Sequence, residues 1–266
     1  MVYYANVTVQ ERVERYTKRG FQHSEAEILV LLEECASGLF FAFPDSFVLF
    51  GGATLVLFYD SPRLSRDLDL LAKTEDLPAV SDLTKVIEAR TQPLGEIFGL
   101  GKLEFQSGSG KEDLIKIWVK SNERRLFSVD LTRIGGTVLK SEEVRKEIAD
   151  SDQKIVVTPS ADALLFQKCE TFLERRIIKS RDAFDINILL ARGARLGENL
   201  KAHLDDFIQI HELDSELIRK RIARIDVKLC TAELRPVLPE KLFKELAEED
   251  FETLRSSLEM VFTDWL

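Results

Sequence analysis

Residues 49–70 read LFGGATLVLFYDSPRLSRDLDL, and this stretch decides the fold. It starts inside the apolar run Phe47–Phe50, which is typical of a buried strand, and passes through Gly51 and Gly52 into a segment, 53–59, that we expect to form a short helix. Pro62 marks a turn, after which polar and apolar residues alternate over 67–71 and predict a second strand. The stretch therefore predicts a strand, a double-glycine turn, a helix and another strand.

Asp67 and Asp69 give this unit its chemistry. Side chains two apart on a strand project from the same face, roughly 7 Å apart along the strand, and carboxylates so placed suit hard divalent cations such as Mg²⁺. Gly51 and Gly52 would let backbone N–H groups approach phosphate oxygens at the start of the following helix. Each feature has a plainer interpretation, because a Gly-Gly pair alone is often only a turn and an Asp-x-Asp alone is often an exposed edge.

A third carboxylate follows from the same alternation in the expected strand 125–134. There Phe127, Val129 and Leu131 share one face, whereas Asp130 lies on the other. Alone, Asp130 would more often make a structural hydrogen bond. Three carboxylates on two strands beside a phosphate-binding turn instead indicate a two-metal site for phosphoryl or nucleotidyl transfer.

The rest of the first half predicts a small sheet with helices, and the second half predicts helices alone. In the first half we expect helices over 25–41 and 77–98, the latter interrupted at Pro93, and strands over 102–106, 114–120 and 125–134. From Thr158-Pro159-Ser160, a helix-start signature, we expect helices over 160–176, 180–191, 198–210, 215–224 and 239–265. The fold class is therefore α+β: a small mixed sheet with flanking helices (1–155), then a helical domain (156–266).

Two helices of the second half carry charged side chains on apolar stripes. Lys168 shares a stripe with Leu164 and Phe172, so it either extends to solvent or reaches an anion. Asp185 shares a stripe with Leu189 and would be directed toward the core, where a carboxylate requires a partner. The alternative is an ion pair that only locks two helices together.

Composition limits the function classes. The chain has 266 residues, a formal charge of −9, and three widely spaced cysteines that fit neither a disulfide framework nor a zinc site. No apolar run approaches the roughly 18 residues of a membrane helix and no signal peptide is evident, so we expect a cytoplasmic protein without a membrane partner. The charge is uneven: residues 240–266 hold eight acidic and three basic side chains, and residues 166–181 hold five basic and two acidic ones. The overall charge thus excludes only a wholly basic nucleic-acid binder.

The pattern GGATLxxxxYxxPRxSxDLDL resembles the first motif of the AbiEii/AbiGii-type nucleotidyltransferase toxins, a branch of the DNA polymerase β-like superfamily. A lysine followed by a basic segment and an Asp-x-x-Asp helix is similar to the family's second motif, here Lys168 and then Asp182 and Asp185. The resemblance covers roughly residues 45–192. Many superfamily members have Ser after the first glycine, where this chain has Gly52.

The resemblance implies roles for these residues. Asp67 and Asp69 would be metal ligands with Asp130 as the third acid, and Gly51 and Gly52 would form the phosphate turn. In place of the missing serine, Thr54, Ser65 or backbone amides would contact the triphosphate. Lys168 and Asp185 would complete the catalytic site, with Lys168 also contacting the nucleotide and Asp182 in support. By this resemblance the helical domain (156–266) would complete the active-site cleft.

The function that the resemblance implies is nucleotidyl transfer by a bacterial toxin. The chain would use one or two Mg²⁺ ions to move an NMP from an NTP onto RNA or tRNA, within a toxin–antitoxin or phage-defence system and with a cognate antitoxin as partner. Two alternatives stay open: a nucleotidyltransferase that modifies a small molecule or a protein hydroxyl, and a catalytically silent nucleotide-binding module.

Overall fold

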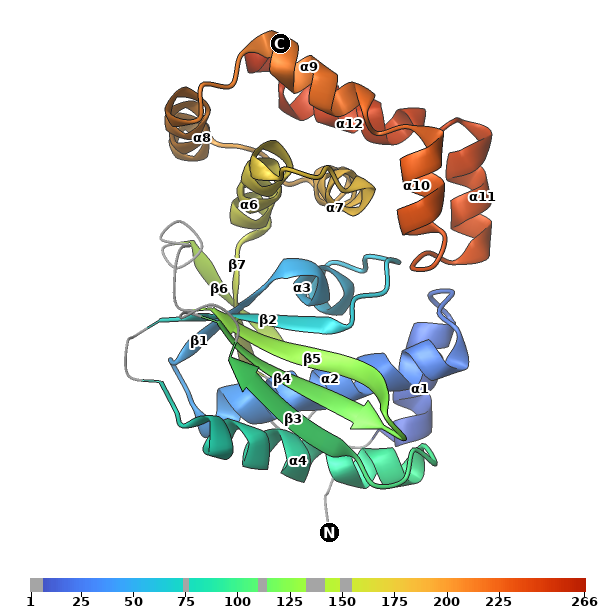
Figure 1. Ribbon diagram of the computed structural model, residues 1–266. Helices are drawn as coiled ribbons and strands as arrows, with labels where there is room; N and C mark the ends of the chain where they lie inside the picture. The colour runs from blue at the N-terminus through green and yellow to red at the C-terminus, as the bar shows by residue number, and fades with distance from the viewer. Residues whose placement is uncertain (1–6, 74–76, 110–113, 133–141, 149–154) are drawn as a thin grey trace. The chain divides into compact units, whose positions relative to one another are not determined.

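A computed structural model describes residues 7–73, 77–109, 114–132, 142–148 and 155–266 of the chain (Figure 1). The chain divides into two compact units, residues 1–159 and 160–266. The first unit combines a mixed sheet with flanking helices, and the second is built from helices. The predicted α+β fold class is confirmed.

A five-stranded sheet forms the centre of the first unit. In spatial order its strands are β1 (Phe47–Phe50), β2 (Asp67–Ala72), β5 (Arg124–Thr132), β4 (Leu114–Ser121) and β3 (Glu104–Ser109). The central pair, β2 and β5, is parallel, and every other neighbouring pair is antiparallel. The expected strand 125–134 ends at Thr132 within the described residues, and residues 133 and 134 lie outside them.

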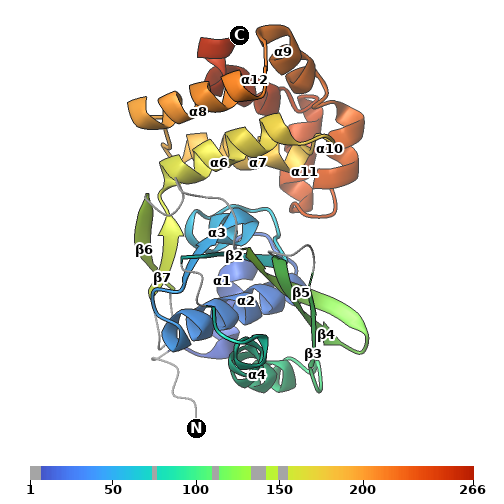
Figure 2. The same ribbon diagram turned by 60° about the vertical axis from the view of Figure 1, so that its left-hand side comes forward.

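One face of this sheet is apolar and covered by helices. Helices α2 (His23–Ala42) and α4 (Val80–Ile97) pack together on that side, as Figures 1 and 2 both show. The face carries buried apolar side chains from the three central strands: Leu68, Leu70, Ile117, Val119, Phe127, Val129 and Leu131. Because strand side chains alternate, the intervening polar residues of these strands lie on the opposite face.

Helix α4 continues through Pro93, where we expected an interruption. Proline lacks the N–H that would bond the carbonyl four residues earlier, which usually weakens a helix. Here the apolar side of α4 is buried along its length by Leu83, Ile87 and Leu94 and packs along α2. This tertiary packing compensates for one missing hydrogen bond.

Two parts of the first unit were not expected from the sequence. Helix α1 (Val9–Thr17) begins at Thr8, whose hydroxyl accepts from the N–H of Glu11 while the Glu11 carboxylate accepts from the N–H of Thr8. This capping box, a Thr followed three residues later by a Glu, was the sequence signal from which the start of α1 could have been predicted. Arg12 of α1 is fully buried and pairs with Glu33 and Glu34 of α2. The second part is a two-stranded sheet of β6 (Glu143–Glu147) and β7 (Ile155–Pro159).

The second unit contains seven α-helices and a terminal 3₁₀ turn among its residues, all of which the structure describes. They are α6 (Ala161–Glu174), α7 (Ser180–Ala191), α8 (Glu198–Ile210), α9 (Ser215–Ala223), α10 (Val227–Leu234), α11 (Glu240–Glu248), α12 (Glu252–Val261) and η1 (Thr263–Trp265). Helix α6 begins after Ser160, whose hydroxyl accepts from the N–H of Ala163. Helix α10 was not expected, although Asp226 caps it in the same way. None of the described helices is long and apolar enough to cross a membrane.

The single helix expected over 239–265 is wrong. The chain breaks between α11 and α12, where Asp250 and Phe251 have positive φ angles of 50° and 58°. The Phe251 ring is fully buried, and its centroid lies 5.8 Å from that of Phe243. In one continuous helix these two residues would be about 12 Å apart along the axis. The turn places the Phe251 ring near Phe243, and it lets α11 pack against α10 and α12 against α7.

Candidate active site

Three of the predicted acids lie together on the open face of the sheet. In the parallel pairing of β2 with β5, Asp69 is directly opposite Asp130 and Asp67 is directly opposite Ser128. All four side chains alternate with the buried apolar residues, so they share one face. The alternation in the sequence predicted this face, and the pairing of the two strands adds the register that brings the acids side by side.

Ser128 connects two of these carboxylates. Its Oγ lies 2.7 Å from Oδ1 of Asp67 and 2.8 Å from Oδ1 of Asp130. A hydroxyl carries a single proton, so Ser128 donates to only one of the two carboxylates at a time. Ser128 lies two residues before Asp130, so alternation puts both on this face, but the contact with Asp67 requires the register of β2 on β5 and could not be read from the sequence.

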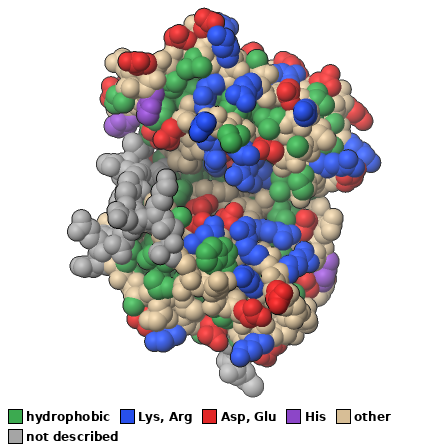
Figure 3. All heavy atoms as spheres, viewed as in Figure 1, with side chains coloured by type: hydrophobic (Ala, Val, Ile, Leu, Met, Phe, Trp, Pro, Cys, Tyr) green, Lys and Arg blue, Asp and Glu red, His purple; other side chains and the backbone are tan. Residues whose placement is uncertain are grey.

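Two cations also contact these acids. Nζ of Lys116 on β4 lies 2.5 Å from Oδ2 of Asp130, and Nη2 of Arg125 lies 3.2 Å from Oδ1 of Asp67. Arg125 reaches this face because the β4–β5 pairing shifts register between Val119 and Lys120. Figure 3 shows Lys and Arg side chains gathered around acidic ones over the region of β2 and β5.

Gly51 and Gly52 start α3 (Gly51–Phe58) directly against this face. Gly51 has a φ of +76°, and a Cβ placed on it would lie only 2.1 Å from Oδ2 of Asp69. A Cβ on Gly52 would lie 2.7 Å from Nη2 of Arg63 and 2.8 Å from Oγ of Ser65. The double glycine therefore lets the backbone approach a carboxylate, a guanidinium and a hydroxyl at once.

Thr54 and Ser65, the expected substitutes for the missing serine, differ in position. Thr54 is fully buried in α3, and its hydroxyl oxygen makes no hydrogen bond to any described residue. Ser65 lies beside Gly52, at the position that a side chain there would approach. Arg63, also largely buried, joins it there. Of the two hydroxyls, Ser65 is the one at the glycine turn.

The donor set around Asp67 and Asp69 fits a hard divalent cation. Mg²⁺ is commonly held by one or two carboxylates and completed by water and substrate phosphates. Both carboxylates are half-buried, and Arg125 already places one positive group at Asp67. Within the described ranges, no group of three or more His, Cys, Asp or Glu side chains is arranged to hold a metal ion. The arrangement is thus a pair of acids, with Asp130 paired to Lys116.

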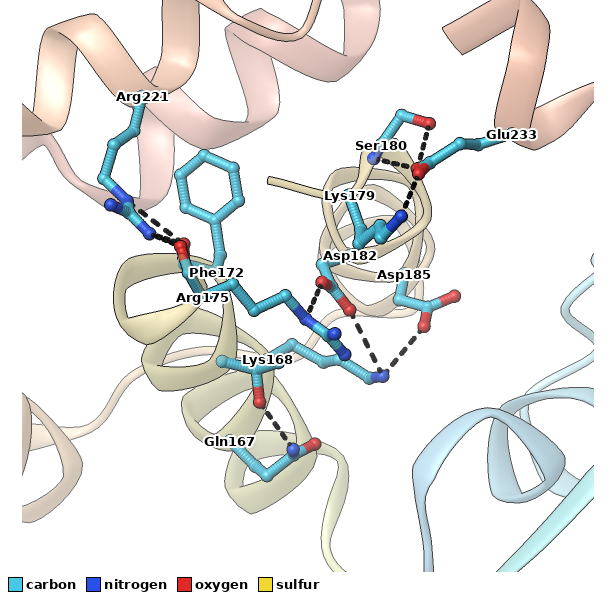
Figure 4. A network of polar contacts seen from close by, with 11 residues as sticks. Gln167, Lys168, Phe172, Arg175, Lys179, Ser180, Asp182, Asp185, Arg221 and Glu233 are labelled. Atoms are coloured by element: carbon cyan, nitrogen blue, oxygen red, sulfur yellow. Dashed lines mark hydrogen bonds and ion pairs between the residues drawn. The ribbon is translucent and has the colours of Figure 1, made fainter. Parts of the chain in front are cut away.

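The remaining predicted residues form a second cluster, in the helical unit (Figure 4). Nζ of Lys168 on α6 lies 2.9 Å from Oδ2 of Asp185 and 3.9 Å from Oδ1 of Asp182, both on α7. Nε of Arg175 lies 2.7 Å from Oδ2 of Asp182, close enough for an ion pair although the atoms are not aligned for a hydrogen bond. Lys168, Asp182 and Asp185 are all buried. An ion pair between α6 and α7 is therefore present, and it is compatible with both interpretations that the sequence left open.

Burial dominates the electrostatics of this cluster. It raises the pKa of Asp182 above its ordinary value, and the positive charges of Lys168 and Arg175 offset only part of that rise. The start of α7 is fixed separately, because the Glu233 carboxylate accepts from the N–H of Ser180 at 2.8 Å and pairs with Lys179 at 2.7 Å. Lys168 and the two aspartates therefore lie on two helices whose first turns are each fixed by side-chain contacts.

Glu170, one half-turn beyond Lys168, predicts a pH effect on stability. Burial, and secondarily the charge of Glu174, raises its pKa from 4.5 to about 7. A folded-state pKa above the unfolded value means that the folded state loses stability as the pH rises from about 4.5 through 7. We expect Glu170→Gln to raise the free energy of unfolding at pH 8 by about 1 kcal/mol, after allowance for solvent screening.

Thermal melts of Glu170→Gln and the unsubstituted chain between pH 4.5 and 8 test this expectation. The melting temperatures should differ by a few degrees at pH 8 and converge near pH 4.5. Glu174→Gln removes the lesser cause and serves as the matched control, with a smaller gain. A difference that does not change with pH would contradict the assignment.

The comparisons agree with this architecture. The sequence matches the family described as "Nucleotidyl transferase AbiEii toxin, Type IV TA system" over residues 38–265. A search of curated proteins found no match. A candidate nucleotidyltransferase from Helicobacter pylori aligns with a TM-score of 0.53 at 15% identity, over 97% of each chain. JHP933 from the same organism aligns with a TM-score of 0.51 at 12% identity, over 98% of this chain and 95% of that one.

At these identities the two solved structures show a shared fold and nothing finer. The family match is of a different kind, because it covers most of the chain and includes the glycine turn, the acid pair and the lysine–aspartate helices. The chain therefore belongs to the AbiEii nucleotidyltransferase toxin family of type IV toxin–antitoxin systems.

Proposed function

We propose that this nucleotidyltransferase moves an NMP from an NTP onto an RNA acceptor, with tRNA as the leading candidate, and that it depends on Mg²⁺. One observation supports the proposal most directly: Gly51, at the start of α3, lies against the carboxylate of Asp69. A phosphate-binding turn and a cation-binding acid are thereby adjacent, as transfer from a triphosphate requires.

Each residue of the first cluster has a role in this proposal. Asp67 and Asp69 would hold the cation, which supplies charge neutralisation at the reacting phosphate. The backbone N–H groups that follow Gly51 would bind the β- and γ-phosphates, and Arg63 and Ser65 would contact the same phosphates from the side of Gly52. Thr54 is fully buried, so we assign the hydroxyl contact to Ser65.

The second cluster would act on the nucleotide from the helical domain. Lys168 would neutralise charge on the triphosphate, and Asp185 would hold its ammonium in place, since the two atoms are 2.9 Å apart. Asp182, paired with Arg175, would support them. Completion of the active-site cleft by the helical domain, residues 156–266, is part of the proposal.

The acceptor and the biological setting complete the proposal. The basic segment 166–181 and the cations beside the sheet acids would attract an RNA end, with an affinity that falls as salt rises. A cognate antitoxin would restrain the enzyme in the cytoplasm, and the pair would serve in phage defence.

Transfer of label from an NTP tests the proposed function. The chain is incubated with each of four α-³²P-labelled NTPs, total RNA and Mg²⁺, and the labelled product is analysed on a denaturing gel. We expect one labelled RNA class, and we expect Asp69→Asn to lower the rate on the order of a thousandfold because about 4 kcal/mol of charge stabilisation is lost.

Asp82→Asn is the matched control, because Asp82 is an exposed acid of α4 that pairs with Lys85 at 2.9 Å. It should leave the rate unchanged. Label in protein or in a small molecule would show that the acceptor is of that class and would contradict the assignment of RNA as the acceptor. The proposal would be refuted if none of the four NTPs gave a labelled product, or if Asp69→Asn transferred label as fast as the unsubstituted chain.

A further inference from the structure

A row of residues crosses the open face of the sheet, and its last side chain is a lysine. From β2 outward it consists of Asp69, Asp130, Lys116 and Gly108, each directly opposite the next. Lys116 is therefore the cross-strand neighbour of Asp130 on the side away from Asp69. A lysine in this row adds a fixed positive charge beside the acids that transfer chemistry would use.

Both oxygens of Asp130 are engaged. Oδ2 is 2.5 Å from Nζ of Lys116, and Oδ1 is 2.8 Å from Oγ of Ser128. The Asp130 side chain is only 16% exposed and that of Lys116 only 23%. A charge-assisted contact that is largely withdrawn from water is stronger than an exposed surface pair. A divalent cation on Asp130 would have to displace this ammonium.

The opposite situation holds at Asp67. Its contact with Arg125 is longer, at 3.2 Å, and the two side chains are 40% and 46% exposed. Exposed ion pairs contribute little, so a divalent cation can replace Arg125 there at low cost. The two acids therefore differ in how firmly their cationic partner is held: Asp67 has a longer contact in an exposed place, and Asp130 has a close contact that is largely withdrawn from water.

The neighbour of Lys116 on its other side is a glycine. This neighbour on β3 is Gly108, and the Trp118 ring lies so close over Gly108 that a Cβ there would be 2.8 Å from the indole. Lys116 thus has Asp130 opposite it on β5, and on β3 a glycine that the Trp118 ring approaches.

We propose that Lys116 supplies the positive charge that a second divalent cation would otherwise supply, so that the chain binds a single divalent cation at Asp67 and Asp69. Asp130 is then the partner of Lys116 and not a metal ligand. This inference rests on the proposed function, because it concerns the cation of the same site. It replaces the three-acid, two-metal arrangement that the sequence alone indicated.

Counting bound Mn²⁺ tests the inference without an activity assay. The purified chain is titrated with Mn²⁺, and free Mn²⁺ is measured by electron paramagnetic resonance. The unsubstituted chain should bind one ion. Lys116→Met, which keeps the length of the side chain and removes its charge, should bind two, and Lys116→Arg should return the count to one.

Two further variants assign the ions to residues. Asp130→Asn should bind one ion with an affinity within about threefold of that of the unsubstituted chain. Asp69→Asn should not bind this ion. In the Lys116→Met background, Asp130→Asn should return the count from two to one. Circular dichroism verifies that each variant is folded.

The outcomes separate this inference from the proposed function. Two ions on the unsubstituted chain, or one ion on both it and Lys116→Met, would overturn the role of Lys116 and leave the proposed function standing. No ion on the unsubstituted chain would overturn both.

Discussion

Gly51→Ala is expected to lower nucleotidyl transfer at least about a hundredfold while the chain stays folded. The new Cβ would lie 2.1 Å from Oδ2 of Asp69, well inside van der Waals contact, so the carboxylate must move away by about an ångström. A displacement of that size at a reacting centre costs roughly a hundredfold in rate. Alanine at the φ of +76° adds about 1 to 2 kcal/mol of backbone strain.

Gly99→Ala separates the displacement from the strain. Gly99 has a nearly equal φ of +68°, but a Cβ there would have nothing within 4 Å. We expect both variants to lose similar stability in urea denaturation and only Gly51→Ala to lose transfer and Mn²⁺ binding. Equal rates for the two variants would show that the approach of Gly51 to Asp69 has no part in the reaction.

The sequence predicted the acid face because that face depends only on local alternation. Asp69 and Asp130 each stand between apolar neighbours on their own strand, and Asp67 lies two residues before Asp69, so their common orientation was readable without any pairing. The helix bounds 198–210 were predicted for a similar reason, since the stripe of Leu200, Leu204 and Ile208 repeats along one face. Local periodicity was sufficient in both cases.

Contacts between strands could not be predicted in the same way. Lys116 meets Asp130 only through the register of β4 on β5, and Arg125 reaches Asp67 only through the irregularity after Val119. A shift of one residue reverses the face of every side chain, and no single strand encodes that shift. The break at Phe251 was missed for a related reason, because its cause is packing against Phe243 rather than a local helix-stop residue.

Lys168→Met is expected to lower the free energy of unfolding by about 3 to 5 kcal/mol. It leaves Asp182 and Asp185, which are 1% and 0% exposed, without the ammonium that lies 3.9 Å and 2.9 Å from them. Removing one partner of a buried pair costs this much because a charge stays behind in a poorly solvated place. Melting temperatures should fall by about 10 °C.

The same substitution cannot say whether Lys168 also acts on the nucleotide, since an unstable chain loses activity for either reason. The double variant Lys168→Met/Asp185→Leu removes the buried Asp185 carboxylate together with the ammonium, and Asp182 keeps Arg175 at 2.7 Å. Replacing both members of a buried pair by apolar residues is often close to neutral, so the double variant should be more stable than Lys168→Met alone.

Activity of the double variant then decides between the two interpretations of this cluster. If the charges only lock α6 to α7, transfer should return together with stability. If Lys168 neutralises the triphosphate, transfer should remain at least about a hundredfold down in a chain that melts near the original temperature. We expect the second result, because a lysine whose sole task is to join two helices could be exchanged for packed apolar side chains without loss, whereas a lysine that meets a phosphate could not.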